Sequence, residues 1–307
     1  MATGLRTILA KAQIRLLGRP APPTPDVLYD PTWEPSDQPQ PSFEHPISQV
    51  CTYAQMRQPS YYEWCRRLAE PWHIHRKLWE WCYIGQVCEV AGALVPGARG
   101  LGFGVGTEPL ASYFASRGCQ VVATDLPVHD AKHEKWNAND EHAAGLASLN
   151  PRGLCTDEQL RTLISFRPVD MMAVPEDLEG FDFVWSSCAF EHLGSLAAGL
   201  DFIRASLGCL KPGGVAVHTT EYNVSSNDET ISSGETVAYR RRDMEELIAQ
   251  LQGEGHGVKS TFALGTDRAD RHVDTPPWSE PHLKIPLGPY VITSYGLAVT
   301  RAVTPTA

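Results

Sequence analysis

Short apolar runs alternate with helix-length segments along most of the chain after residue 95. Four runs of strand length lie at 119–124, 164–169, 181–187 and 215–219. Such runs are typical of buried strands, and helices between successive strands favour a parallel sheet covered on both faces. Two further runs, residues 258–264 and 290–301, are expected to close the sheet. The pattern predicts a doubly wound α/β fold.

The first 95 residues show a different pattern, and we expect them to form an N-terminal helical extension. Residues 1–19 place apolar and basic side chains at helical spacing, which predicts an amphipathic helix. Nine prolines between residues 20 and 46 predict an extended arm, because proline fixes φ and removes a backbone donor. The rest of the extension is helical in pattern and rich in aromatic side chains. The second predicted domain covers residues 96–307, with an insertion at about 265–289.

Composition and charge narrow the functional classes. The chain has 307 residues and a formal net charge of -10, which argues against a protein that grips the nucleic acid backbone. Its eight cysteines form no CxxC pair and no zinc-ligand spacing, which favours reduced thiols in a cytoplasmic protein. No apolar run approaches the roughly 20 residues that span a bilayer. A basic amphipathic helix at residues 1–19 would still allow peripheral contact with an anionic membrane surface.

A glycine-rich turn follows the first predicted strand of the second domain. Gly102, Gly104 and Gly106 occupy alternate positions in this turn. Glycines at such positions let the backbone approach a ligand closely. Asp125 ends the next predicted strand, where an acid is well placed to bind both hydroxyls of a ribose. This arrangement predicts a nucleoside cofactor.

The order of these and later motifs resembles the class I S-adenosylmethionine-dependent methyltransferases. The matching stretches lie between Ala98 and Arg301 and read LGFGVG, VVATDLP, VDMM, FDFVWSS followed by EH, and LKPGG. A dinucleotide-binding fingerprint would need glycine where this chain has Thr107. The resemblance implies a Rossmann-like, doubly wound, seven-stranded sheet that is mostly parallel with an antiparallel C-terminal strand. It also implies S-adenosylmethionine as the cofactor.

The resemblance assigns cofactor-binding roles to residues at the ends of the predicted strands. The three turn glycines would border the methionine and ribose, Asp125 would hold the ribose hydroxyls, and Leu126 would lie against adenine. Asp170 would accept a hydrogen bond from the adenine amino group, and Met171 would pack on the ring. Ser187 would line the floor of the site beneath the sulfonium.

One position departs from the family pattern. The family usually has an acid two residues before the first glycine of the turn, near the methionine amino group, and this chain has Gly100 there. Glu108 is a candidate for a compensating charge, although an acid in the first turn of a helix is favourable in any case. The departure leaves open how the amino-acid end of the cofactor is held.

Candidate catalytic residues follow the strands predicted at 181–187 and 215–219. An oxygen acceptor needs a general base or a metal, and we expect His192 to act as the base and Glu221 to orient it or the substrate. The alternative for His192 is a packing role at the start of a helix predicted from Glu191 to Leu210. A metal site is not predicted, but a divalent metal is an alternative because suitable ligand types occur at Glu191, His192, His218, Glu221 and His282.

The acceptor is expected to bind between the aromatic helical block and the insertion. His73, His75, Arg76 and Lys77 crowd one part of that block and could reach a polar ligand. Tryptophans with polar neighbours suit a sugar or another polar metabolite. We therefore expect O-methylation of a sugar or glycan, or of a small hydroxylated metabolite. The alternatives are a protein or peptide methyltransferase and an inactive cofactor-binding partner subunit, and the oligomeric state is not predicted.

Overall fold

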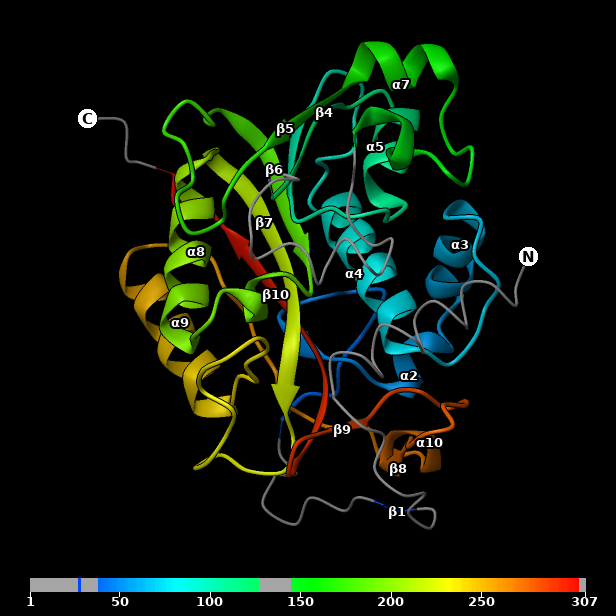
Figure 1. The fold of residues 1–307 in the computed structure, drawn as a ribbon, viewed down its shortest axis with the longest axis vertical. Coiled ribbons are helices and arrows are strands. Elements are labelled where there is room, and N and C mark those ends of the chain that lie inside the picture. Colours follow the sequence, from blue (N-terminus) through cyan, green and yellow to red (C-terminus); the bar gives the residue numbers. More distant parts are fainter. Residues whose placement is uncertain (1–26, 29–37, 127–144, 304–307) are drawn as a thin grey trace.

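A mixed sheet runs through the middle of the molecule and carries helices on both faces (Figure 1). The computed structural model describes residues 27–28, 38–126 and 145–303. Five parallel strands form most of the sheet, in the order β5 (Ile164–Pro168), β4 (Gln120–Asp125), β3 (Arg99–Phe103), β6 (Phe181–Ser187) and β7 (Leu210–Asn223). The last long strand, β10 (Tyr290–Thr300), pairs with β7 in the antiparallel direction.

The long helices divide between the two faces of this sheet. On one side lie α4 (Arg76–Val90), α5 (Leu110–Ser116) and α7 (Asp157–Leu163), and on the other lie α8 (Leu196–Gly208) and α9 (Arg241–Gly253) (Figure 1). Each face has its own hydrophobic cluster, which explains why the parallel strands are continuous apolar runs. The predicted doubly wound α/β fold with an antiparallel C-terminal strand is confirmed.

The predicted helix from Glu191 to Leu210 is interrupted, and the interruption shapes the site described below. Phe190–His192 form a short 3₁₀ helix, η3, and α8 begins only at Leu196. Gly194 adopts a left-handed conformation with φ of +88°, which few other residues tolerate. The Ser195 hydroxyl then accepts a hydrogen bond from the Ala198 N–H at 3.2 Å and caps the new helix.

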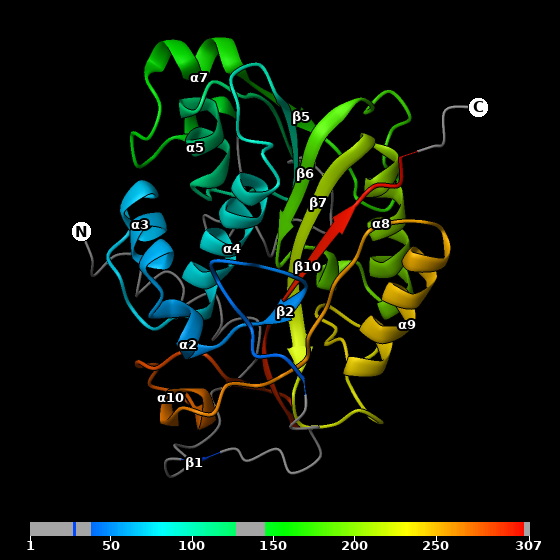
Figure 2. The ribbon, with the colours of Figure 1, turned by 180° about the vertical axis from the view of Figure 1, so that it is seen from behind.

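The edge of the sheet differs from the prediction. Residues 258–264 do not form a strand, because the edge of β10 is occupied by a strand from the N-terminal extension, β2 (Gln49–Val50) (Figure 2). The segment instead pairs with Ser48, whose N–H donates to the Lys259 carbonyl at 2.9 Å. A further short strand, β9 (Ile285–Leu287), pairs with the start of β10. Among the described residues the sheet therefore has eight strands rather than the predicted seven.

The described part of the proline-rich arm packs against the helices that follow it. Phe43 is fully buried, with its ring 5.1 Å from that of Tyr61, and the Gln58 side chain accepts its N–H at 2.9 Å. The predicted amphipathic helix at residues 1–19 lies outside the described residues. The remaining short elements are α2 (Tyr53–Met56), α3 (Pro59–Arg67), η2 (Leu146–Leu149), α10 (Arg268–Arg271) and the pair β1 (Val27–Leu28) and β8 (His272–Val273).

Within the described ranges, none of the helices combines the length and the apolar character that crossing a bilayer requires. All eight cysteines lie in these ranges and are free thiols, and seven of them are buried. The predicted domain boundary between residues 95 and 96 falls in the connection from α4 to β3. That boundary stays a prediction.

Candidate functional site

The glycine turn lies where the strand order reverses. The chain runs from β3 outward through β4 and β5, and then returns to β6 on the opposite side of β3. In doubly wound sheets the crevice at such a reversal, at the carboxyl ends of the strands, is where ligands bind. Gly104 and Gly106 have φ values of +58° and +50° at this point. The fold therefore places the predicted turn at the expected binding edge.

Asp125 lies directly against the turn. Its carboxylate accepts hydrogen bonds from the Gly106 N–H at 3.1 Å and from the Leu126 N–H at 2.8 Å. These contacts hold the carboxylate at the carboxyl end of β4, beside the end of β3. This is the placement that the predicted ribose-binding role requires.

Met171 and the end of β6 border the other side of the turn. A Cβ atom added to Gly104 would lie 2.9 Å from the Ala189 Cβ and 3.6 Å from the Met171 sulfur. The Asp170 carboxylate accepts the Met172 N–H at 2.8 Å, which fixes the loop after β5. Residues from three separate predicted motifs thus converge around Gly104, and they fit a cofactor whose bulk passes close to a bare backbone.

Gly100 and Gly102, which lie within β3, are glycines because neighbouring aromatic rings leave no room for a side chain there. A Cβ atom on Gly102 would lie 2.4 Å from the Trp185 ring, and one on Gly100 would lie 2.3 Å from the Phe183 ring. Both rings are fully buried. The family acid is therefore absent at Gly100 because an aromatic ring fills the space that its side chain would need.

Glu108, the predicted candidate for a compensating charge, lies just before α5 and close to Lys77. Burial raises its pKa to about 8, although nearby Lys77 opposes the shift. One of its carboxylate oxygens is buried and has no hydrogen-bond partner among the described residues. A buried oxygen without a partner is costly and would be satisfied by a cationic group.

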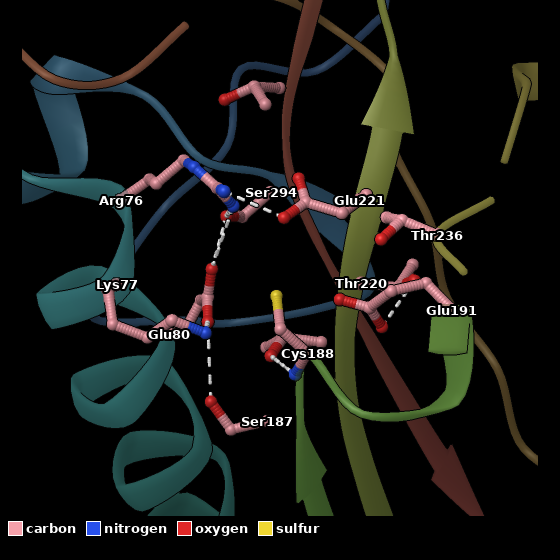
Figure 3. Close-up of polar contacts among 12 residues, drawn as sticks. Arg76, Lys77, Glu80, Ser187, Cys188, Glu191, Thr220, Glu221, Thr236 and Ser294 are labelled. Atoms are coloured by element: carbon pink, nitrogen blue, oxygen red, sulfur yellow. Dashed lines mark hydrogen bonds and ion pairs between the residues drawn. The ribbon is translucent and has the colours of Figure 1, made fainter. Parts of the chain in front are cut away.

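Helix α4 brings charged side chains to the same edge of the sheet (Figure 3). The Lys77 ammonium lies 2.7 Å from a Glu80 carboxylate oxygen, and the Ser187 hydroxyl donates to that oxygen at 3.3 Å. The Arg76 guanidinium donates to the Ser294 hydroxyl at 3.2 Å and lies 3.4 Å from the other Glu80 oxygen. Glu80 is fully buried, so these neighbours compensate the loss of hydration of its charge.

Glu221, near the carboxyl end of β7, pairs with α4 rather than with His192. Its Oε1 accepts a hydrogen bond from the Arg76 guanidinium at 2.7 Å, and its Oε2 has no hydrogen-bond partner among the described residues. Burial raises the pKa of Glu221, and Arg76 opposes the rise. Glu221 therefore lies at the predicted site, but its carboxylate pairs with Arg76 and not with His192.

Glu191 lies across from Glu221 on the 3₁₀ helix η3. It is fully buried, and its Oε2 accepts a hydrogen bond from the Thr220 hydroxyl at 3.2 Å. Its Oε1 has no hydrogen-bond partner among the described residues. Burial and the nearby Glu221 charge raise the pKa of Glu191 to about 8.

His192 keeps a neutral imidazole beside this acid pair. Its Nδ1 lies 2.9 Å from the Glu235 carbonyl oxygen, which makes Nδ1 the protonated nitrogen. Burial lowers the pKa of His192 to about 4. The other nitrogen, Nε2, lies 3.9 Å from Glu191 Oε1. A neutral histidine with this tautomer can accept a proton at Nε2.

The two other candidate histidines do not join His192. His218 points to the opposite face of the sheet, where its ring nitrogens lie 2.8 Å from the Ser186 hydroxyl and 3.0 Å from the Ser206 hydroxyl. His282 pairs with the buried Asp274 and stacks on His75 with ring centroids 4.4 Å apart. The insertion thereby reaches the start of α4, because His75 caps that helix. Of the five metal-ligand candidates, Glu191 and Glu221 offer ligand atoms within 4.8 Å of each other, and His192 lies beside Glu191 with its Nε2 3.9 Å from Glu191 Oε1.

Two residues of the site had no predicted role, Glu80 and Cys188. Glu80 interrupts the apolar run LWEWCYI, and an acid inside a fully buried helix face is a signal that sequence reading could have used. Cys188 follows β6 directly and has a positive φ of +45°, which only the structure reveals. Both face the space between α4, β6 and β7 in Figure 3.

Comparison with known proteins agrees with this arrangement. A family described as a methyltransferase domain matches residues 79–256, more than half of the chain. No curated protein matches.

Solved structures that resemble the chain include TehB from Haemophilus influenzae, at 16% identity and a TM-score of 0.45, over 71% of this chain and 62% of that one. Magnesium protoporphyrin IX methyltransferase from Synechocystis PCC 6803 is 13% identical with a TM-score of 0.42, over 80% and 94% of the two chains. The chain thus spans less than two thirds of the TehB length.

The matched family covers the glycine turn, Asp125, the Asp170–Met171 pair and the carboxyl ends of β6 and β7. The predicted cofactor, S-adenosylmethionine, is the methyl donor of the family that the resemblance named. By its matched domain and its doubly wound fold, the chain belongs to the class I S-adenosylmethionine-dependent methyltransferase family.

Proposed function

We propose that this methyltransferase transfers its methyl group to a hydroxyl oxygen of a sugar, a glycan or a small hydroxylated metabolite. The observation that carries the proposal is the group formed by neutral His192 and the buried carboxyls of Glu191 and Glu221. This group lies at the carboxyl ends of β6 and β7, the sheet edge that also carries the glycine turn. A hydroxyl needs a proton acceptor at that place before it can attack.

The two acids favour oxygen over nitrogen as the acceptor atom. An amine must be uncharged to accept a methyl group, whereas carboxylates beside it would stabilise the protonated ammonium form. A hydroxyl carries no such charge and gains from a base within reach.

Residues of this chain are proposed to hold S-adenosylmethionine along its length. S-adenosylmethionine supplies a methyl group on a sulfonium, which is already an activated leaving group. Asp125 would hold the ribose hydroxyls, with Leu126 against adenine, and Asp170 and Met171 would bind the other side of the ring. We assign the methionine carboxylate to Lys77, and its amino group to the unpartnered oxygen of Glu108.

The acceptor pocket is proposed to lie between the start of α4 and the insertion. Trp278 packs edge-on against His282 at a centroid distance of 5.5 Å, and His282 stacks on His75 next to Arg76. Aromatic rings that alternate with polar groups are suited to a sugar, whose apolar ring face stacks while its hydroxyls form hydrogen bonds. The described arm at 38–46 packs on its own chain, which gives no support to the alternative of a peptide substrate.

Two experiments test the proposal in sequence. Calorimetric titration with S-adenosylmethionine should show binding, and failure to bind would refute both the O-methyltransferase and the protein or peptide methyltransferase readings. Methyl-labelled cofactor is then incubated with separated pools of sugars and glycans, small hydroxylated metabolites, amines and proteins. Label should enter a hydroxylated pool, and its appearance in amines or proteins alone would refute O-methylation. Where an acidic residue of the site is replaced in these assays, Asp177→Asn serves as the matched control. Asp177 is exposed and pairs only with Arg167 among the described residues.

A further inference from the structure

The carboxyl ends of β6 and β7 bring together a thiol and two carboxyls. The Cys188 sulfur, one oxygen of Glu191 and one oxygen of Glu221 all lie within 4.8 Å of one another. Figure 3 shows the sulfur pointing into the space between the α4 side chains and the β7 side chains. We propose that these three residues form a binding site for a divalent zinc ion.

The free oxygens of the two acids carry the proposal. Each carboxylate has one oxygen held by a neighbour, Arg76 for Glu221 at 2.7 Å and Thr220 for Glu191 at 3.2 Å. The other oxygen of each acid is buried and has no hydrogen-bond partner among the described residues. Carboxylates that ligate metals are oriented in this way, with one oxygen in an outer hydrogen bond and the other toward the ion.

The distances are compatible with a small closure around an ion. Zinc binds sulfur at about 2.3 Å and carboxylate oxygen at about 2.0–2.2 Å, so neighbouring ligands in a tetrahedral site lie about 3.5 Å apart. Ligand atoms within 4.8 Å of one another need to move by only about an ångström each, which side-chain rotation can supply. Cys188 is half-buried, which leaves an entry path for the ion.

The backbone of Cys188 fixes the direction of the thiol. Its φ of +45° is unusual for a residue with a side chain. The Cys188 N–H donates to the Thr219 carbonyl at 3.0 Å and lies 3.2 Å from the Thr219 hydroxyl. Strained conformations of this kind persist where surrounding contacts enforce them, and they concentrate at functional sites.

The charge balance and the donor types favour zinc. Metal binding would deprotonate the Cys188 thiol and the Glu191 and Glu221 carboxyls, and the divalent charge would offset the negative charge gathered on these three ligands. One thiolate with two carboxylates suits zinc better than magnesium, which prefers oxygen donors alone.

Three protein ligands leave the fourth position of a tetrahedral zinc open, as in catalytic sites. This position would take the acceptor hydroxyl, a role that rests on the proposed function. The ion would lower the pKa of that hydroxyl, and His192 would receive its proton. Binding of the ion itself requires no substrate. The zinc site can therefore be refuted without refuting O-methylation, and O-methylation can be refuted without refuting the zinc site.

Cobalt substitution provides the test, because a thiolate bound to cobalt gives a near-ultraviolet charge-transfer band. The metal-free protein, titrated with Co²⁺ alone, should bind one ion with this band, and excess Zn²⁺ should remove the band. Cys188→Ser should abolish the band, whereas Cys209→Ser, which changes a buried cysteine at the end of α8, should keep it. Glu191→Gln should weaken binding at least tenfold, measured by competition with a chelating dye.

Each outcome decides the proposal. Absence of one-to-one binding in the wild-type protein would refute it, as would a band that persists in Cys188→Ser. Unchanged affinity in Glu191→Gln would remove that residue from the ligand set and refute the three-ligand site. Thermal melting of each variant distinguishes loss of the site from loss of folding, and the wild-type titration decides the question without any variant.

Discussion

Replacing Gly100 by alanine tests whether the Phe183 ring excludes a side chain from this position. The new Cβ would lie 2.3 Å from Phe183 Cζ, far inside contact distance. The ring cannot easily yield, because it is fully buried and packs against Phe114 and Trp185 at centroid distances of 5.1 and 5.9 Å. Overpacking of this kind costs about 1–3 kcal/mol, and the close contact places Gly100→Ala near the upper end.

Denaturant unfolding of the wild-type protein and four variants measures this effect. Phe183→Leu should cost about 1–2 kcal/mol on its own, because it leaves a small cavity. The double variant should cost at least about 1 kcal/mol less than the sum of the single variants, since the smaller side chain makes room for the new methyl group. Gly208→Ala is the matched control: nothing lies within 4 Å of a Cβ there, and alanine in helix α8 should leave stability unchanged or raise it slightly.

Two results would refute this explanation of the missing acid. The first is a Gly100→Ala protein as stable as the Gly208→Ala control. The second is strict additivity in the double variant, which would show that the methyl group and the ring do not interact. Unfolding midpoints are compared only between proteins whose free energy of unfolding falls with denaturant concentration at the same slope. A change in the unfolded state is then not mistaken for a change in packing.

Three further predictions concern single residues. Asp125→Ala should weaken S-adenosylmethionine binding at least about tenfold in calorimetry, because a charged hydrogen-bonding partner is lost, and unchanged affinity would exclude its ribose role. His192→Gln should lower the rate of methyl transfer by about 10²–10⁴ while cofactor affinity stays the same, and full turnover would exclude it as the base. His218 should destabilise the protein in acid: burial lowers its folded pKa to about 3, while the unfolded chain takes up the proton near pH 6.5. Stability therefore falls as the pH decreases from 6.5 toward 3, by about 2 kcal/mol at pH 5. In His218→Gln the slope of unfolding free energy against pH should be smaller by one proton in that window, and an unchanged slope would contradict the assignment.

The proximity of the predicted cofactor-binding residues could be anticipated because each of them follows directly from a local pattern. Gly104, Asp125 and Met171 each come just after an apolar run, and parallel strands bring their carboxyl ends to one edge. Order along the chain was enough to place these residues together. The structure adds that Gly100 and Gly102 are required by aromatic rings on β6.

The proposed acceptor half depends on contacts between distant segments. Glu80 and Glu221 are joined through Arg76 and Ser294, which come from opposite ends of the chain and show no shared pattern in the sequence. The start of α8 was placed too early because an apolar run hid the break at Gly194. The edge strand at 258–264 was wrong because a segment more than 200 residues earlier competes for the same backbone groups.

The placement of β2 at the edge of β10 has a consequence for how the protein is made. The Ser48 hydroxyl bonds the Ala298 carbonyl across a separation of 250 residues. A ribosome adds about 5–20 residues per second, so β2 emerges roughly 12–50 seconds before its partner strand. During translation, β2 and the outer edge of β7 lack their partner strand until β10 is made and inserts between them. The sheet is therefore completed only after β10 has been made, and a ribosome that stalls before residue 290 would release a chain with two open strand edges.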